Sequence, residues 1–111
     1  MTFYEFYKDF FEGTEDMIDI SNASATGVDA PKEIESQDIW DILKIFRNEE
    51  IALKWVKENY LHYLERVKKE LLDDDGICAV TASLYEDARI SKTLYCITKL
   101  KNGSFVLWES Y

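Results

Sequence analysis

The side chains that most often do chemistry in enzymes are scarce in this sequence. It contains one histidine, His62, and two cysteines, Cys78 and Cys96. A nucleophilic triad or a metal centre needs several such groups, and none stands at a motif spacing from His62. The cysteines lack CxxC spacing, although they fall on neighbouring predicted strands where they could approach each other. We interpret them as buried, reduced thiols, and we expect no catalytic residue, no metal site and no cofactor.

The acidic run before Gly76 has some features of a calcium-binding loop. If Gly76 took the sixth loop position, Asp75 and Asp73 would take the fifth and third. The first position would then be Leu71, which cannot bind a cation, so the pattern fails. We interpret Asp73, Asp74 and Asp75 as the solvated end of a helix. Negative charge is unfavourable at a helix C-terminus, which leaves a weak cation site as the alternative.

Charge is the most informative feature of the composition. The chain has 22 acidic and 13 basic residues, a net charge of −9. Residues 1–50 hold the whole excess, whereas residues 51–111 are balanced. Direct binding to nucleic acid is disfavoured because phosphate contacts need clustered Lys and Arg, and a protein with a basic surface is the expected partner. The candidate partner-binding acids are Glu12, Glu15, Asp16, Asp19, Asp29, Glu33, Glu35, Asp38 and Asp41.

Size and composition indicate one globular domain over residues 1–111. The chain is 47% hydrophobic and 32% charged, which is typical of a folded protein. No apolar run approaches the ~20 residues of a membrane span. The first residues lack the basic region of a secretory signal, and two cysteines are too few for a disulfide framework. We therefore expect a cytoplasmic protein with no membrane partner.

The N-terminal residues predict a helix with both ends marked. Thr2 followed by Glu5 forms a capping box, and Gly13 is placed to end the helix. Aromatic side chains recur at helical spacing between these ends, which is typical of a buried stripe. The predicted stripe consists of Phe3, Phe6, Tyr7 and Phe10.

Apolar residues three and four apart predict two further helices, over residues 36–47 and 48–71. Ser36 and Asn48 are their expected N-caps. The second would be a rod of roughly 35 Å and the backbone of the fold. Residues 14–35 break the periodicity and are predicted to be an irregular acidic connection, either functional or mobile. Three of its apolar residues are candidates for a short strand or turn against the domain: Met17, Ile18 and Ile20.

In the last third of the chain the apolar period changes to two, which is typical of β-strands. Three antiparallel strands are predicted near residues 77–85, 92–101 and 104–111. The last two flank Asn102-Gly103, a strong signal for a two-residue hairpin turn.

The two-residue turn predicts which side chains share a face of the hairpin. It pairs Lys101 with Ser104, and we expect the more apolar of the two resulting faces to pack on the helices. The other face is half apolar. Either it is an exposed partner surface, with the terminal strand a free edge for a homodimer, or residues 14–35 fold back and bury it. The apolar residues of that face are Tyr95, Ile97, Val106 and Trp108.

The sequence as a whole predicts an α+β fold: three helices followed by a three-stranded antiparallel sheet packed on them. The expected function is a non-catalytic acidic binding protein. Its most concrete form is a small inhibitor that occupies the basic nucleic-acid-binding surface of a larger protein, with carboxylates in place of phosphates. The alternatives are an immunity- or antitoxin-type protein that neutralises a toxic enzyme, a structural adaptor, and acidity that only confers solubility.

Overall fold

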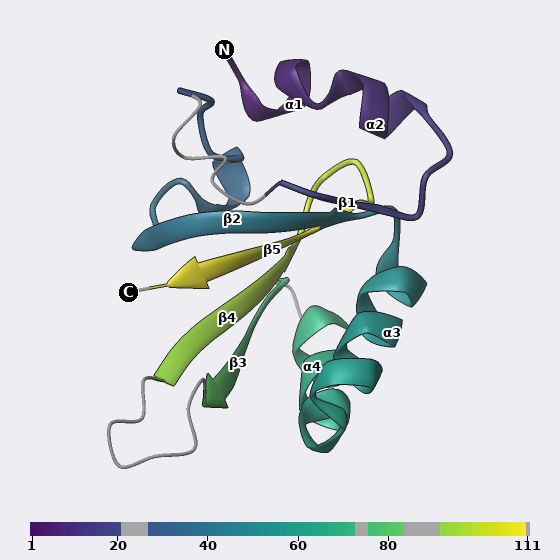
Figure 1. The fold of residues 1–111 in the computed structure, drawn as a ribbon, viewed down its shortest axis with the longest axis vertical. Helices are drawn as coiled ribbons and strands as arrows, with labels where there is room; N and C mark the ends of the chain where they lie inside the picture. The colour runs from purple at the N-terminus through teal and green to yellow at the C-terminus, as the bar shows by residue number, and fades with distance from the viewer. Residues whose placement is uncertain (21–26, 73–75, 84–91, 111) are drawn as a thin grey trace.

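The computed structural model describes residues 1–20, 27–72, 76–83 and 92–110. Within them the chain forms a five-stranded antiparallel sheet with helices, which confirms the α+β class (Figure 1). The order across the sheet is β1-β2-β5-β4-β3, so the predicted three-stranded sheet is too small. The strands are β1 (Met17–Asp19), β2 (Ile39–Phe46), β3 (Ile77–Ser83), β4 (Lys92–Lys99) and β5 (Phe105–Ser110).

Helices cover both faces of the sheet, so the prediction of helices on one face is wrong. One layer consists of α1 (Phe3–Phe6), α2 (Lys8–Glu12) and the 3-10 turn η2 (Lys32–Ile34). The other consists of α3 (Glu49–Asn59), the 3-10 turn η3 (Leu61–Tyr63) and α4 (Leu64–Leu72). Each layer encloses its own hydrophobic core against the sheet. Among the described residues, no helix has the length and apolar character needed to cross a bilayer.

The predicted helix caps at Thr2 and Asn48 both form through side-chain oxygens. Thr2 Oγ1 accepts a hydrogen bond from the backbone N–H of Glu5 at 3.2 Å, and Asn48 Oδ1 accepts from that of Ile51 at 3.0 Å. The first helix is interrupted at Tyr7, which separates α1 from α2. The aromatic stripe is buried at two of its positions, Phe3 and Phe10.

Residues 36–47, predicted above to be a helix, contain strand β2 instead. The register of β2 against β5 shifts between Ile39 and Asp41 and again between Ile42 and Lys44. At each shift β2 has one extra residue, so side chains on one face of the sheet stand three positions apart and not two. Ile39, Ile42 and Ile45 therefore all face the α1–α2 core. This spacing imitates a helix. Because both faces of the sheet are covered, β2 is also apolar on both sides.

The predicted rod over residues 48–71 is broken into two packed helices. The backbone leaves the helical region at Tyr60, with φ −144° and ψ 54°. The side-chain amide of Asn59 donates to the carbonyl of Trp55 at 2.7 Å and so competes for the last turn of α3. The chain then turns back, and α3 and α4 lie side by side (Figure 1). Val56 and Val67, one from each helix, are fully buried in their shared core.

The terminal hairpin has a three-residue loop, not the predicted two-residue turn. The Leu100 N–H donates to the Ser104 carbonyl at 2.8 Å, and the Gly103 N–H donates to the Leu100 carbonyl at 3.0 Å. Gly103 has φ +89°, the left-handed conformation that this loop needs at its last position. The register therefore slips by one residue, and Cys96 pairs with Trp108. A slip of one residue turns every side chain of β5 to the other face.

The predicted exposed patch does not form. Val106 and Trp108 lie in the core beneath α1 and α2, and Ile97 lies in the opposite core beneath α3 and α4. Ile97 and Val106 are 0% exposed and Trp108 is 1% exposed. Tyr95 is half-buried. The physical reason is the second helical layer, because a sheet covered on both faces leaves neither face of β5 free.

The terminal strand is also not a sheet edge. β5 pairs with β2 on one side and with β4 on the other, so a homodimer through its free edge is ruled out. The alternative prediction, that residues 14–35 fold back over the face of the hairpin that carries Trp108, is correct in part. Ile20 is buried in the same core as Trp108, with Ile18 packed against it, while Met17 is exposed.

Candidate functional site

The residues with the greatest catalytic potential lie apart from one another. Cys78 and Cys96 are free and buried, but Cys78 faces the α3–α4 core and Cys96 the α1–α2 core. The two cysteines do lie on neighbouring strands, as predicted, but their side chains point to opposite faces of the sheet, so the thiols do not meet. Burial raises the pKa of Cys78 to about 12 and that of Cys96 to about 11, which opposes the thiolate that a nucleophile needs. His62 is exposed, with its ring against Tyr63.

No metal centre is found in the described part of the chain. There, no three His, Cys, Asp or Glu side chains are grouped closely enough to hold an ion. The weak cation site considered for residues 73–75 lies outside the described residues.

The nine candidate acids fall into two groups along the chain, one around β1 and one around η2 and the start of β2. Strand β1 pairs with the last residues of β2, while η2 precedes the first residues of β2 (Figure 1). Glu12, Glu15, Asp16 and Asp19 follow the chain from α2 into β1, and all four are exposed. The group near η2 and the start of β2 consists of Asp29, Glu33, Glu35, Asp38 and Asp41.

Arg47 organises the backbone around β1 and bonds to none of its carboxylates. Its guanidinium donates to the backbone carbonyls of Phe10 at 2.7 Å, Phe11 at 3.2 Å and Glu15 at 2.8 Å. The same group lies 4.4 Å from the centre of the Phe10 ring. Arg47 thus caps the C-terminus of α2 and fixes the turn into β1, and its donors bind carbonyls and not carboxylates. Sequence reasoning missed this role because Arg47 was placed at the end of a helix.

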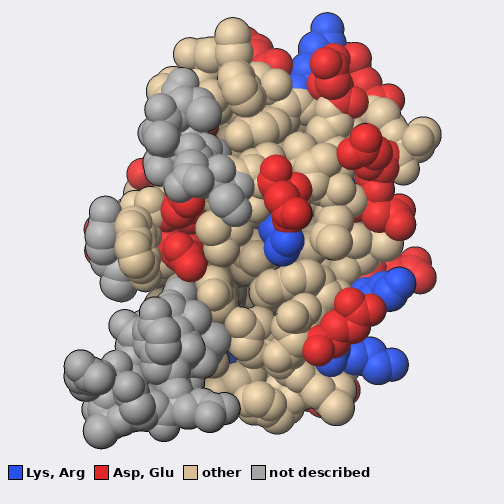
Figure 2. Space-filling view, viewed as in Figure 1, with Lys and Arg blue, Asp and Glu red and all other residues tan. Residues whose placement is uncertain are grey.

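The carboxylates near β1 are only partly paired. Asp19 forms an ion pair with Lys44, and Glu12 lies 3.9 Å from Lys8 across one helical turn. Glu15 and Asp16 form no ion pair with any described residue. Figure 2 shows acidic side chains over much of this face, with basic ones beside them at the top, in the centre and at the lower right.

In the group near η2, Glu33 has a structural role, and Asp41 lies beside another carboxylate. The Tyr4 hydroxyl and the Lys101 backbone N–H both donate to Oε2 of Glu33, the latter at 3.1 Å. Glu33 thereby ties η2 to α1 and to the terminal hairpin. Burial first, and the hydrogen bond and charge of Glu33 second, raise the pKa of Tyr4. Asp41 is half-buried and pairs across the strands with Glu109. Burial first, and Asp41 second, raise the pKa of Glu109.

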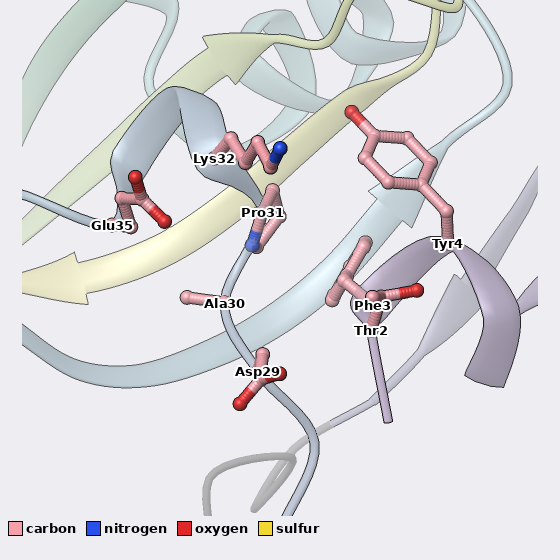
Figure 3. A pocket seen from close by; sticks show the side chains of 8 residues that line it. All are labelled: Thr2, Phe3, Tyr4, Asp29, Ala30, Pro31, Lys32 and Glu35. Atoms are coloured by element: carbon pink, nitrogen blue, oxygen red, sulfur yellow. The ribbon is translucent and has the colours of Figure 1, made fainter.

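A hollow of about 430 Å³ lies between the start of α1 and residues 29–35. Figure 3 shows Thr2, Phe3 and Tyr4 on one side and the 29–35 segment on the other. Asp29 and Glu35 both line it, and Lys32 lies between them in sequence. These two acids of the group thus share an opening that already contains a base.

Comparisons of the chain with known protein families, with curated proteins and with solved structures found no match.

Proposed function

We propose that the protein is a non-catalytic inhibitor that occupies the basic nucleic-acid-binding surface of a larger protein. The observation that carries this proposal is that two acids around β1 are exposed and lack ion-pair partners among the described residues. Glu15 and Asp16 are exposed and form no ion pair among the described residues, while the nearby Arg47 is bound to backbone carbonyls. The fold thus directs the donors of its nearest cation to backbone carbonyls and leaves the Glu15 and Asp16 carboxylates accessible to a partner.

Such a surface suits Arg and Lys side chains that normally bind phosphates. Carboxylates accept the same charge-assisted hydrogen bonds as phosphate oxygens, and Arg binds them in a bidentate manner. The net charge of −9 also speeds encounter with a basic partner and repels nucleic acid from the protein itself. The proposal places the protein in the cytoplasm, where its buried thiols Cys78 and Cys96 stay reduced.

The test is capture from a lysate of the native cell, followed by competition with nucleic acid. A captured protein should bind duplex DNA or RNA, and added duplex should displace it from the acidic protein. The variant Glu15→Lys/Asp16→Lys/Asp19→Lys should lose the captured protein, whereas Glu65→Lys/Glu70→Lys on α4 should retain it. Capture that nucleic acid leaves unchanged would contradict the inhibitor role. If the captured protein is then a toxic enzyme inactivated by binding, the immunity-type alternative is correct.

A further inference from the structure

We propose that β1 accepts an extended, Lys- or Arg-containing segment of a partner protein as an additional strand of the sheet. This inference rests on the proposed function, because it specifies how the acidic surface holds its basic partner. In the structure β1 is the outermost strand, with α2 above it and α3 below it in Figure 1.

The backbone hydrogen bonds of β1 show which of its residues are already used. The Arg47 N–H donates to the Asp16 carbonyl at 2.7 Å, and the Ile20 N–H donates to the Leu43 carbonyl at 2.8 Å. In an antiparallel pair, residues that bond to the neighbouring strand alternate with residues that do not. Ile18 lies midway between Asp16 and Ile20, so it also directs its backbone N–H and C=O groups toward β2.

Met17 and Asp19 consequently direct their N–H and C=O groups away from β2. An added strand can form up to four main-chain hydrogen bonds with these two residues. Of the features that protect natural edge strands from pairing, β1 has short length and a charged residue, but it has no proline and no bulge, and its register with β2 is unbroken. The strand has only three residues, so side-chain contacts must supply much of the binding energy.

One hollow for such side chains lies on the α1–α2 side of β1. It has a volume of about 430 Å³ and includes Phe6, Phe10 and Ile18 in its lining. Asp9 and Glu15 line the same hollow. Phe6 is 45% exposed although it belongs to the aromatic stripe, so apolar surface is available there.

A second, smaller hollow lies on the opposite side of β1, against α3. Its volume is about 140 Å³, and Met17 and Trp55 line it. Asp16 and Glu58 contribute carboxylates, which outweigh the single charge of Lys54 in the same lining. Met17 is 43% exposed, so its side chain is accessible to a partner.

The arrangement of these hollows matches the geometry of a strand. Successive side chains of a strand point to opposite faces, so neighbouring residues of an added strand enter the two hollows in turn. Each hollow combines apolar side chains with carboxylates, which suits the long aliphatic stem and charged end of Lys or Arg. The opposite sheet edge, β3, carries no charged residue and so cannot select a basic strand by charge.

The test uses a blocked seven-residue peptide of alternating lysine and valine as the probe. The full-length protein should bind it, and the backbone amides of Met17 and Asp19 should gain protection from hydrogen exchange. A peptide of the same sequence in which every internal backbone nitrogen is methylated should bind at least tenfold more weakly, because it has no N–H to donate and its methyl groups block pairing with an edge strand. Met17→Pro, which removes an outward N–H at a position where edge strands tolerate proline, should weaken the first peptide at least tenfold.

Equal affinity for the two peptides would overturn strand addition, and so would an absence of binding. If Met17→Pro does not fold, the exchange data on the unmodified protein decide, since unchanged amides at Met17 and Asp19 would refute the inference. Failure here is distinguishable from failure of the proposed function. Equal, salt-sensitive binding of both peptides refutes strand addition alone, whereas the proposed function fails only if nucleic acid does not displace the captured protein.

Discussion

The indole nitrogen of Trp108 donates a hydrogen bond to Oγ1 of Thr98 at 3.0 Å. Both residues are 1% exposed, and they come from neighbouring strands of the hairpin, β5 and β4. The bond satisfies the one polar hydrogen of a large side chain in the α1–α2 core. It forms only in the observed register, because Thr98 and Trp108 must lie on the same face of the sheet.

Replacing Thr98 by Val should destabilise the protein. The indole N–H would be left buried without an acceptor, which costs about 1–3 kcal/mol of unfolding free energy. Urea unfolding followed by circular dichroism measures the change. Thr81→Val on the exposed surface of β3 is the control and should change stability by less than about 0.5 kcal/mol. Equal effects of the two substitutions would mean that the Trp108 bond contributes nothing.

Replacing Gly103 by Ala should also reduce stability. Its φ of +89° is unfavourable for a residue with a Cβ, and a Cβ at this position would have no neighbour within 4 Å, so the loss is purely one of backbone conformation. We expect about 1–2 kcal/mol, and a smaller loss for Gly103→Asn, because Asn adopts left-handed conformations more readily. Thermal unfolding of the two variants checks this order, and a more stable Ala variant would argue for a different loop.

Arg47→Lys should be far from conservative. The guanidinium bonds three carbonyls at once, and a lysine ammonium cannot reproduce that planar arrangement over Phe10. The expected loss is about 1.5–3 kcal/mol, the range for hydrogen bonds to charged groups. Arg66→Lys is the matched control, because Arg66 is exposed and donates to Glu70 one helical turn away; its unfolding free energy should barely change. An unchanged unfolding free energy in Arg47→Lys would mean that Arg47 does not organise the β1 region.

The buried thiols should make the protein less stable at alkaline pH. The pKa values of Cys78 and Cys96 are raised on folding, so the unfolded chain releases these protons first. Their contribution is fully present below the ordinary thiol pKa of about 8.5 and is lost as pH rises toward the folded values. Between pH ~8.5 and ~10 each thiol should lower the unfolding free energy by up to about 1.4 kcal/mol per pH unit. Denaturant titrations of the protein and of Cys78→Ala/Cys96→Ala measure the slope, and an equally steep slope without the cysteines would contradict this origin.

Among the local signals in the sequence, two helix caps were reliable, whereas the turn length at Asn102-Gly103 and the cap expected at Ser36 were wrong. The caps at Thr2 and Asn48 form as predicted because each needs only its own side chain and the next turn of helix. The three C-terminal strands were also predicted, since their alternation is regular. Strand β2 was missed because its two register shifts give Ile39, Ile42 and Ile45 a helix-like spacing that only pairing with β5 explains.

The candidate site was predictable in its charge but not in its geometry. Composition indicated the acids of residues 12–41, yet not that Glu33 holds Tyr4 and the hairpin, which lies 68 positions away at Lys101. The predicted patch at Trp108 failed because helices cover both faces of the sheet, and the three-residue loop at Gly103 also inverts the faces of β5. Long-range contacts such as that of Glu33 with Lys101 leave no local trace in the chain.

The association rate constant with the captured partner, measured against ionic strength, tests the central claim most directly. An acidic surface that engages a basic one is steered by long-range charge, which salt screens over ~8 Å at physiological ionic strength. The rate constant should fall about tenfold or more between low and high salt, and the Glu15→Lys/Asp16→Lys/Asp19→Lys variant should associate slowly at every salt concentration. A rate constant that does not change with ionic strength would contradict the account.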